Sequence, residues 1–358
     1  MLRGKIMSKI HIEKLKEICK KALENAGMNP EHAEITADVL SETDGHGVFS
    51  HGTKNLFGYI KKSRAGGLDI KAEPTVIKDG PAFAVIDAKQ AMGMIPSVKA
   101  MELAVQKATQ IGIGIVTVKN STHFGANGYY ANIAGKEGML GLVFSNVDPN
   151  MNVPGAREKA IGNNPIAFSC PSRTFPTVYL DIAISTVASL KVFKARAEGL
   201  SIPETWIVDK DGIPTNDPSN YPDEGAMQPM SGHKGYGIAF LVDAITGALS
   251  GGATSIGGDI TSWVLNLAAP NNACHTFVAI NPNMFCDESD YADRVEAMAT
   301  QLRSLPKAKG SERIYLPGEI EWERYAKAKL EGIELPDDVL KSLQDLADDA
   351  GLALPLIT

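Results

Sequence analysis

The stretch IGIVTVKNSTHFGANGYYANIAGKEGMLGLVFSNV, residues 113–147, places two apolar runs on either side of a helical stretch. The runs at 113–118 and 140–147 predict strands, and the residues near 127–138 predict a helix between them. Strand, helix and strand in this order form the unit from which α/β proteins are built. We therefore predict an α/β fold, in which the loop containing His123 follows directly on the first strand.

The same alternation continues on both sides of this stretch. Residues 11–27 and a helix that begins at Pro30, capped by Asn29, predict a helical pair at the start. We interpret Met1 to Lys5 as a ragged extension and 213–234 as a long surface loop. These elements predict a largely parallel or mixed sheet with flanking helices. The remaining strands are predicted at 82–88, 177–183, 205–212 and 275–282, and the remaining helices near 94–111, 235–250, 287–305 and 337–349.

The composition argues against several classes of protein. A length of 358 residues predicts one large or two medium domains, and we take two as the working number. The net charge is −7 and the basic residues form no stripe, which argues against nucleic acid as a partner. The apolar run 235–252 contains Asp243 and many glycines and falls short of a membrane span. Four widely spaced cysteines without a CxxC pair, and a start without a signal peptide, predict reduced thiols and a cytoplasmic location.

Four glycine-containing segments carry the polar side chains that could do chemistry: SHG at 50–52, STHFGANG at 121–128, AIGNNP at 160–165 and SGHKGYG at 231–237. Their glycines let the backbone turn tightly or approach a ligand. His123 stands beyond the carboxyl end of a predicted strand, where active residues of α/β proteins collect. The alternative for His123, and equally for His51, is a structural histidine that caps a helix or bonds a loop carbonyl.

A metal site built from Asp44, His46 and His51, with His123 as a further ligand, is an alternative, because carboxylate and imidazole are common ligands. It would make the protein a metal-dependent hydrolase or lyase. The step of five residues from His46 to His51 does not put both rings on one helical face, and the sequence has no HExxH motif or Cys/His cluster. These features argue against a metal.

Lys234 stands among glycines just before an apolar helix. Its ammonium and the free amides of the helix start would favour a phosphate, and a solvated loop lysine is the alternative. The sequence contains no GxGxxG, because GIGIV and GYGIAF each lack the third glycine. A dinucleotide site of the Rossmann type is therefore not predicted.

Longer motifs, in unbroken order from about residue 10 to about residue 342, resemble the type-2 malate/L-lactate dehydrogenase family: SHGTKNLFGYIKKSRAGGL, STHFGANGYYANIAGKEGMLGLVFSN, GNNPIAF, LDIAISTVASLKV, IPETWIVDKDGIPTNDP, GHKGYGIAFLVDAITGALSGG, INPNMF and LPGEIEWER. The resemblance implies a nicotinamide-binding fold that is not of the Rossmann type, which agrees with the missing glycine motif. It also implies a homodimer whose active sites draw on both subunits. On this basis residues 7–119 and 290–358 form a catalytic and dimerisation domain, and residues 120–289 form a cofactor-binding domain.

The resemblance also implies roles for residues within these motifs. His51 and His123 are expected to line the reacting carbon, with Ser50 as a neighbour. The cofactor is expected to contact the segment Asp181, Ile182, Ala183, Ile184 and Ser185, the pair His233 and Lys234, and the residues Gly318 and Glu319.

One position departs from the pattern of many relatives, which carry an arginine four residues after the SHG histidine. Asn55 stands there, with Lys54 beside it. Asparagine offers neutral donors only, and lysine is a point charge rather than a planar fork. Recognition of a substrate carboxylate is therefore expected to be weaker, to shift to Lys54, or to serve a different substrate.

The predicted reaction is hydride transfer between NAD(P)H and a small 2-oxo or 2-hydroxy acid of the malate, lactate or ureidoglycolate type. The cofactor supplies the hydride and a histidine carries the proton, because the histidine pKa lies near neutrality. We assign the proton to His123, with His51 and Ser50 orienting the substrate, and the opposite assignment of the two histidines is the alternative. Asp44 either fixes the tautomer of one histidine or is a surface carboxylate.

Two further polar residues are candidates for contact with ligands. Asn163 could donate its amide to the nicotinamide or the substrate, although with Asn164 it also fits a plain turn. Asp148 could accept from a ribose hydroxyl, which would favour NAD over NADP because a carboxylate repels a 2′-phosphate. NAD is the expected cofactor and NADP the alternative. A binding protein that kept the fold without turnover is a third interpretation.

Overall fold

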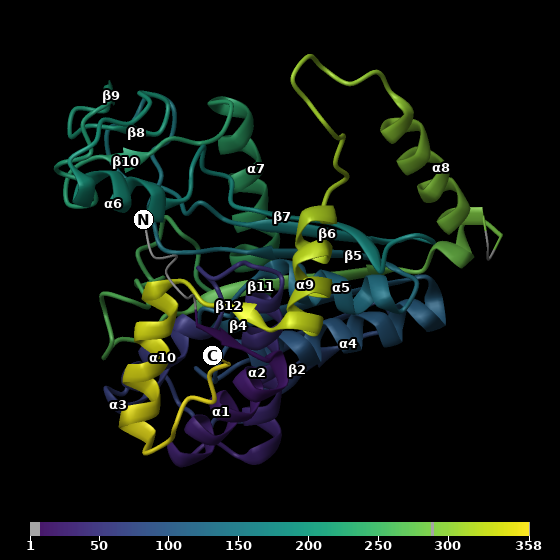
Figure 1. Cartoon of the computed structure of the whole chain (residues 1–358), viewed down its shortest axis with the longest axis horizontal. Coiled ribbons are helices and arrows are strands. Elements are labelled where there is room, and N and C mark those ends of the chain that lie inside the picture. Colours follow the sequence, from purple (N-terminus) through teal and green to yellow (C-terminus); the bar gives the residue numbers. More distant parts are fainter. Residues whose placement is uncertain (1–7, 288–289, 358) are drawn as a thin grey trace, which may run out of the picture.

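A seven-stranded mixed sheet forms the centre of the computed structural model, which describes residues 8–287 and 290–357 (Figure 1). The pair β3–β4 is parallel and the other neighbouring pairs of this sheet are antiparallel. The prediction of a mixed sheet is confirmed. The alternative prediction, a largely parallel sheet, is wrong. In sheet order the strands are β2 (Thr75–Asp79), β3 (Phe83–Asp87), β4 (Ile113–Ser121), β11 (Ala273–Ile280), β5 (Leu140–Ser145), β6 (Ile166–Pro171) and β7 (Thr177–Ile182).

The strand β11 explains this difference. It comes from late in the chain, pairs between β4 and β5, and runs antiparallel to both. Phe277 belongs to the main core, whereas the hydroxyl of its neighbour Thr276 donates to the Ile245 carbonyl at 2.7 Å. Successive side chains of a strand point to opposite faces of the sheet, so β11 is covered on both faces. Its pairing depends on contacts that are distant in the sequence.

Helices cover both faces of the sheet (Figure 1). Two helices lie on the face of the main core, and a third, which continues into a π-helical turn, lies on the other. Gly114 on β4 permits close helix packing, because a Cβ built there would lie 2.0 Å from the Ala104 carbonyl oxygen. All three helices were predicted from the sequence. These elements are α4 (Met94–Ile111), α5 (Asn127–Lys136), α7 (His233–Asp243) and the turn η2 (Ala244–Ala248).

The helices from the two ends of the chain pack together into a helical body, most of which lies in the lower part of Figure 1, with α9 (Glu319–Glu331) nearer the centre and packed on α2. Asn29 caps α2 as predicted, since its Oδ1 accepts the His32 N–H at 2.8 Å and Pro30 takes the first helical position. A short antiparallel pair of strands joins the two ends of the chain. The elements are α1 (Ile12–Asn25), α2 (Pro30–Gly45), η1 (Thr53–Asn55), α3 (Leu56–Arg64), α9 (Glu319–Glu331), α10 (Asp337–Ala350), β1 (Lys9–Ile10) and β12 (Ile333–Glu334).

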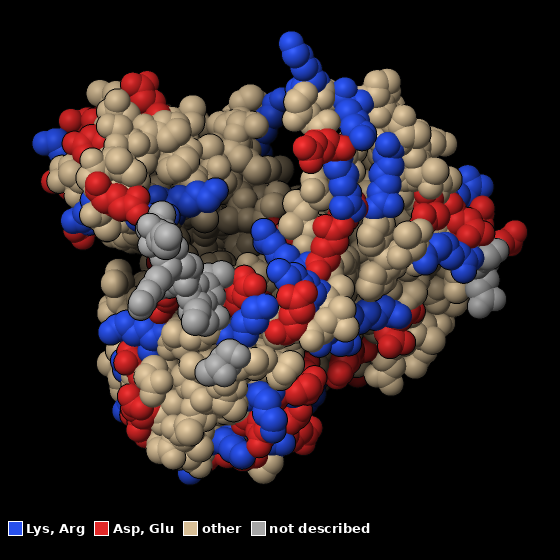
Figure 2. Space-filling view, viewed as in Figure 1, with Lys and Arg blue, Asp and Glu red and all other residues tan. Residues whose placement is uncertain are grey.

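A smaller lobe with its own hydrophobic core lies at the upper left of Figure 1. The stretch 213–234, predicted as a loop, contains two short strands, and the strand predicted at 205–212 is only two residues long. Figure 2 shows a hollow between this lobe and the helical body, with acidic and basic side chains interspersed on the same face. The elements are α6 (Ser189–Glu198), β8 (Ile207–Val208), β9 (Pro214–Thr215) and β10 (Ala226–Met227).

The helix α8 (Asp290–Ser304) stands away from the helical body at the upper right of Figure 1. It is attached to the turn between β6 and β7, where Glu296 accepts the Ser172 hydroxyl at 3.1 Å and the Thr174 N–H at 3.1 Å. The helix predicted at 287–305 is therefore present. Residues 288–289 of this prediction, and the predicted extension Met1 to Lys5, lie outside the described residues.

The large sheet draws on both predicted domains. β2, β3 and most of β4 come from the first predicted segment, and the other strands come from 120–289. The division into a catalytic and a cofactor-binding domain stays a prediction. Among residues 8–287 and 290–357, no helix combines the length and the apolar character that a membrane span requires.

Candidate active site

Two histidines that are distant in the sequence face each other. His51 lies in the turn after α2, and His123 lies in the loop after β4. Their ring centroids are 5.6 Å apart, with an interplanar angle of 26°. Gly125 permits this approach, because its φ is +84° and a Cβ there would lie 3.3 Å from the His51 carbonyl oxygen. The structure thus brings together the two histidines predicted for the reacting centre.

Both imidazoles have a hydroxyl partner on Nδ1. Tyr59 Oη lies 2.5 Å from His123 Nδ1, and Ser50 Oγ lies 2.8 Å from His51 Nδ1. The Trp263 indole stacks on the His123 ring at 4.7 Å and packs against the Tyr59 ring at 4.9 Å. One face of His123 is therefore covered and its Nδ1 is occupied, so Nε2 is the atom available to a ligand.

Sequence patterns alone miss Tyr59 and Trp263. Tyr59 stands on α3, in the same SHGTKNLFGY motif as His51, and this proximity is the signal that could have found it. Trp263 comes from the loop at 261–271, which has no chemical motif. Its contact with His123 exists only in the folded chain.

Burial determines the protonation of the histidine pair. It lowers the pKa of His123 well below 6.5, and the nearby His51 and His275 lower this pKa further. Burial also lowers the pKa of His51. Both imidazoles are therefore neutral at neutral pH, and each can accept a proton.

His275 on β11 is a third histidine close to this pair, and the sequence patterns do not point to it. Its Nδ1 lies 2.8 Å from Ser145 Oγ, and its Nε2 lies 3.0 Å from Ser121 Oγ. Its ring stacks on Phe124 at 4.0 Å, and burial lowers its pKa to about 3. Since both ring nitrogens are bonded and the side chain is fully buried, His275 supports the loop that carries His123.

Asp44 holds the turn after His51 and bonds no imidazole. Its carboxylate accepts the Thr53 N–H at 3.1 Å and also the Thr53 hydroxyl. Gly52 packs so closely that a Cβ there would lie 1.8 Å from Asp44 Oδ1. Burial raises the pKa of Asp44 to about 7. Both predictions for Asp44 are wrong, because it does not fix a histidine tautomer and it is 1% exposed rather than on the surface.

His46 is enclosed by aromatic rings from α9. It stacks on Tyr325 at 4.5 Å and meets the edge of Trp322 at 4.7 Å, and burial lowers its pKa to about 4. Within the described ranges 8–287 and 290–357, no group of three or more His, Cys, Asp and Glu side chains could hold a metal ion. The metal-dependent alternative built on Asp44, His46 and His51 therefore lacks its ligand set.

Lys54 and Asn55, the candidates for a substrate carboxylate, both make contacts within the chain. Lys54 Nζ donates to Asp338 Oδ2 on α10 at 2.7 Å, and Asn55 Nδ2 donates to the Ser50 carbonyl at 2.9 Å. The Ser342 hydroxyl adds a bond to the Lys54 carbonyl at 2.6 Å. These bonds fix the turn that carries Ser50 and His51 to α10. A role for Lys54 or Asn55 in substrate binding stays a prediction.

Segments predicted for the cofactor lie side by side in the smaller lobe. The Ile184 N–H donates to the Asn163 carbonyl at 2.9 Å, and the Met230 N–H donates to the Ile184 carbonyl at 2.8 Å. These two backbone hydrogen bonds form a short ladder, and the chain continues from Met230 into α7, which begins at His233. Both His233 and Lys234 are exposed. An exposed lysine at the N-terminus of a helix suits the phosphates of a dinucleotide.

Asp181 connects this region to the histidines. It lies at the end of β7, next to Ile182 and Ala183, and its Oδ2 accepts the Gly128 N–H at 2.7 Å, in the first turn of the helix that follows His123. Burial raises the pKa of Asp181 to about 6. Its carboxylate therefore caps α5 and joins the end of β7 to the helix that follows His123.

Gly318 and Glu319 lie beside the start of β7. A Cβ on Gly318 would lie 2.5 Å from the Tyr179 ring, so this position accepts only glycine without a shift. Glu319 is buried and accepts the Leu316 N–H at 2.9 Å and the Arg303 guanidinium at 2.9 Å. Glu319 thus organises its own turn, and a cofactor contact by its side chain stays a prediction.

Asp148 lies on the loop after β5 and is half-buried, and burial raises its pKa. Asn150, two residues later, accepts the Asn163 N–H at 2.8 Å, so this loop adjoins the same ladder. Asn164 is fully buried, and its side-chain oxygen accepts the Val147 N–H at 3.1 Å. Asn164 therefore makes structural bonds inside the lobe, Asn163 is half-buried and Ser185 is buried.

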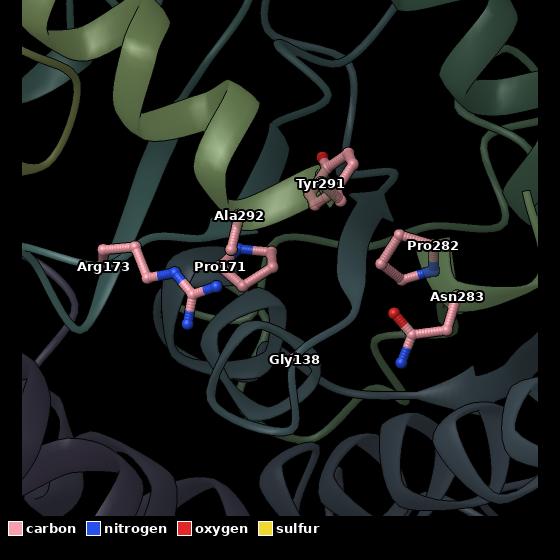
Figure 3. Close-up of a pocket in the computed structure, with 7 residues that line it drawn as sticks. All are labelled: Gly138, Pro171, Arg173, Pro282, Asn283, Tyr291 and Ala292. Carbon is pink, nitrogen blue, oxygen red and sulfur yellow. The ribbon is translucent and has the colours of Figure 1, made fainter. Parts of the chain in front are cut away.

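A groove with a volume of about 540 Å³ lies elsewhere, against α8. Figure 3 shows Tyr291 and Ala292 of α8 above it, and Pro282 and Asn283 on one side. None of the predicted site residues lines it. The site around His123 is therefore identified by its chemistry and not by the size of a cavity.

Comparison with known proteins decides the family. The sequence profile described as malate/L-lactate dehydrogenase matches residues 10–344. The chain belongs to the malate/L-lactate dehydrogenase family. It is 34% identical to L-sulfolactate dehydrogenase of Methanocaldococcus jannaschii, over 95% of this chain and 96% of that protein. It is 32% identical to ureidoglycolate dehydrogenase (NAD(+)) of Escherichia coli, over 94% of this chain and 95% of that protein.

A solved structure agrees with this assignment to the malate/L-lactate dehydrogenase family. Sulfolactate dehydrogenase from Methanocaldococcus jannaschii superposes with a TM-score of 0.89 at 32% identity, covering 97% of this chain and 98% of that chain. The resemblance seen in the sequence is confirmed, and so is the α/β fold with a mixed sheet and flanking helices. As a member of this family the chain is an oxidoreductase of the dehydrogenase type.

Proposed function

We propose that the chain transfers a hydride between a nicotinamide cofactor and a small 2-oxo or 2-hydroxy acid. The observation that supports this most directly is the stacked pair His51 and His123, 5.6 Å apart, in a chain of a dehydrogenase family. Reduction of a 2-oxo acid requires a hydride at the carbonyl carbon and a proton at its oxygen. The cofactor supplies the hydride, so the protein has to carry the proton.

His123 is the proton carrier in this proposal. With its Nδ1–H directed at the Tyr59 oxygen, 2.5 Å away, Nε2 exchanges the proton with the substrate oxygen. The lowered pKa of His123 makes the imidazolium a stronger acid for reduction and keeps the neutral base available for oxidation. The bond to Tyr59 fixes the ring orientation, as second partners of reactive histidines generally do.

His51 and Ser50 orient the substrate. The Ser50 hydroxyl lies 2.8 Å from His51 Nδ1, which settles the orientation of that ring beside His123. The substrate is a carboxylic acid with a 2-oxo or 2-hydroxy group, because the named relatives act on sulfolactate and ureidoglycolate, which share this chemistry. Lys54 reaches a substrate carboxylate in this proposal only by exchanging its contact with Asp338.

A nicotinamide cofactor fits the donor set of the smaller lobe. The Lys234 ammonium and the positive end of the α7 dipole would hold its phosphates, and the edge formed by Asn163 and Ile184 to Ser185 would hold the nicotinamide end. When bound, the cofactor supplies the hydride. We propose NAD as the preferred form, because the Asp148 carboxylate would repel the 2′-phosphate of NADP.

We also propose that the protein works as a homodimer in the cytoplasm. Large apolar side chains are exposed on α7 and just after it, namely Phe240, Leu241 and Leu249, each more than half exposed. Exposed apolar clusters of this kind often mark protein interfaces. A second copy that covers this helix would complete the shared active sites that the family resemblance implies.

The test follows nicotinamide absorbance while the purified protein meets a panel of 2-oxo acids, with NADH and NADPH in parallel and with and without a chelator. We expect oxidation of one cofactor with at least one acid, unaffected by the chelator. Loss of turnover on chelation would support a metal-dependent reaction instead. Cofactor binding without turnover across the panel would support the binding-protein interpretation and contradict the proposal.

A further inference from the structure

Lys62 on α3 is fully buried and its ammonium is bonded to backbone carbonyls. Its Nζ donates to the carbonyl oxygens of Asn266 at 2.8 Å and Ala269 at 2.6 Å, with 0% of the residue exposed. Among the described residues no carboxylate pairs with it. Lysines are almost never fully buried without a paired charge, because losing hydration is costly. The burial of Lys62 without a paired carboxylate therefore suggests that its contacts have a functional role.

The two carbonyls belong to residues 261–271, which we call the Trp263 loop. Its ends are joined, since the Thr261 N–H donates to the Asn271 carbonyl at 3.1 Å and Asn271 Nδ2 donates back to the Thr261 carbonyl. From this closed base Trp263 reaches His123. At the tip of the loop Leu265 is 78% exposed. With an exposed tip and a closed base, the loop is held in its middle by Lys62.

The helix α3 presents both contacts on one face. Tyr59 and Lys62 are three residues apart, a spacing that puts side chains next to each other on a helix. Tyr59 bonds His123, while Lys62 bonds the loop whose indole covers His123. Gly67, just after α3, lies against the backbone of the same loop, because a Cβ there would be 2.2 Å from the Leu267 oxygen, 2.6 Å from the Ala269 oxygen and 2.9 Å from Lys62 Nζ. The helix α3 thus positions both the His123 imidazole and the Trp263 indole that covers it.

We propose that Lys62 is a positioning residue of the active site, whose ammonium holds the Trp263 loop so that the indole covers His123. Lys62 touches neither the substrate nor the reacting atoms and acts through Trp263. The cover excludes water from the proton carrier and strengthens electrostatic interactions inside the site. This inference rests on the proposed function, because the cover matters for turnover only if His123 carries the proton.

The test is a double-mutant cycle on kcat/KM with Lys62→Met, Trp263→Ala and the combined variant. Lys62→Met keeps the length of the side chain and removes its charge. We expect it to lower kcat/KM by about tenfold or more, because a small misplacement at a reacting centre is costly. In the Trp263→Ala background the same change should alter kcat/KM less than about twofold, since residues that act through one contact are not additive. Additive losses would overturn the proposal.

Lys107→Met is the matched control. Lys107 is also a buried lysine, 8% exposed, and its Nζ donates to Asp79 at 2.5 Å and to the Gly80 carbonyl at 2.7 Å. It stands on α4 and contacts the end of the edge strand β2, which is separated from β4 by β3. We expect this variant to lose stability and keep kcat/KM. If Lys62→Met behaves in the same way, with a lower melting temperature and an unchanged kcat/KM, its role is only structural and the proposal is wrong.

Two further measurements keep the proposal testable. If Lys62→Met does not fold, Gly67→Ala places a methyl group against the Leu267 and Ala269 carbonyls and against Lys62 Nζ, and it should reproduce the loss of kcat/KM. Acrylamide quenching of tryptophan fluorescence, with Trp263→Ala as the baseline, should rise in Lys62→Met without any need for turnover. An inactive wild type with a protected Trp263 would contradict the proposed function alone, whereas equal quenching in wild type and Lys62→Met would contradict the role of Lys62.

Discussion

The hydroxyl oxygen of Tyr59 and Nδ1 of His123 lie 2.5 Å apart, and they join the helix α3 to the loop after β4. Burial raises the pKa of Tyr59, so the phenol stays neutral and adds no charge beside the imidazole. The pair therefore controls the orientation of His123 without changing the charge of the site.

Tyr59→Phe should lower kcat by about tenfold to a hundredfold, because the His123 ring loses the partner that fixes it. The affinity for the cofactor should change little. Steady-state kinetics and a cofactor titration separate the two effects, and thermal unfolding controls for stability. A kcat equal to that of the wild type would show that the contact with Trp263 alone positions the ring.

The pH dependence should report the lowered pKa of His123. In the oxidation direction the neutral imidazole is the base, so kcat/KM should rise with pH through a pKa below 6.5 and stay level at higher pH. In the reduction direction the imidazolium is the acid, so kcat/KM should fall with pH through the same pKa. Profiles in both directions check this, and a shared inflection above about pH 7 would contradict the assignment.

Asp148→Ala should weaken the preference for NADH over NADPH. The carboxylate is expected to repel the 2′-phosphate, so its removal should lower the ratio of the two kcat/KM values by about tenfold. Asp211→Ala, which changes an exposed aspartate in the same lobe, is the control and should leave the ratio unchanged. An unchanged ratio in Asp148→Ala would place cofactor choice elsewhere.

Asp44→Asn should make folding stability less sensitive to pH. The pKa of Asp44 is about 7 in the fold against 3.8 as the ordinary value, so folding favours the protonated carboxyl. The stability from this group is present below the ordinary value and is lost as pH rises toward the folded value. The wild type should lose about 2 kcal/mol more than Asp44→Asn between about pH 5 and pH 8. Urea unfolding at both pH values measures the difference, and parallel losses would exclude Asp44 as the source.

Local patterns predicted much of the fold. The strands β3, β4 and β5, the helices α4 and α5 and the cap Asn29 follow from side-chain periodicity and helix signals that a single stretch carries. β11 was predicted as a strand, but its insertion between β4 and β5 depends on pairing across the chain. The edge strand β2 was missed because most of its side chains are exposed, so it shows no apolar alternation.

The site was predicted only where its residues stand in short motifs. His51 and His123 were found because glycines and polar residues surround them, and the structure brings them together. Trp263 and Tyr59 were missed because aromatic residues are usually core residues, and only the fold shows which of them contact an imidazole. The role of Asp44 was predicted wrongly because its carboxylate is buried against Gly52. The position of an aspartate near a helix end in the sequence does not show whether its side chain is buried.

The most direct test of the central claim compares wild type and His123→Ala in both cofactor oxidation and cofactor binding, with the exposed His11→Ala as the control. If His123 carries the proton, His123→Ala should lose about 10²–10⁴-fold in turnover in both directions and bind the cofactor as tightly as the wild type does. Turnover within a few-fold of the wild type would contradict the account.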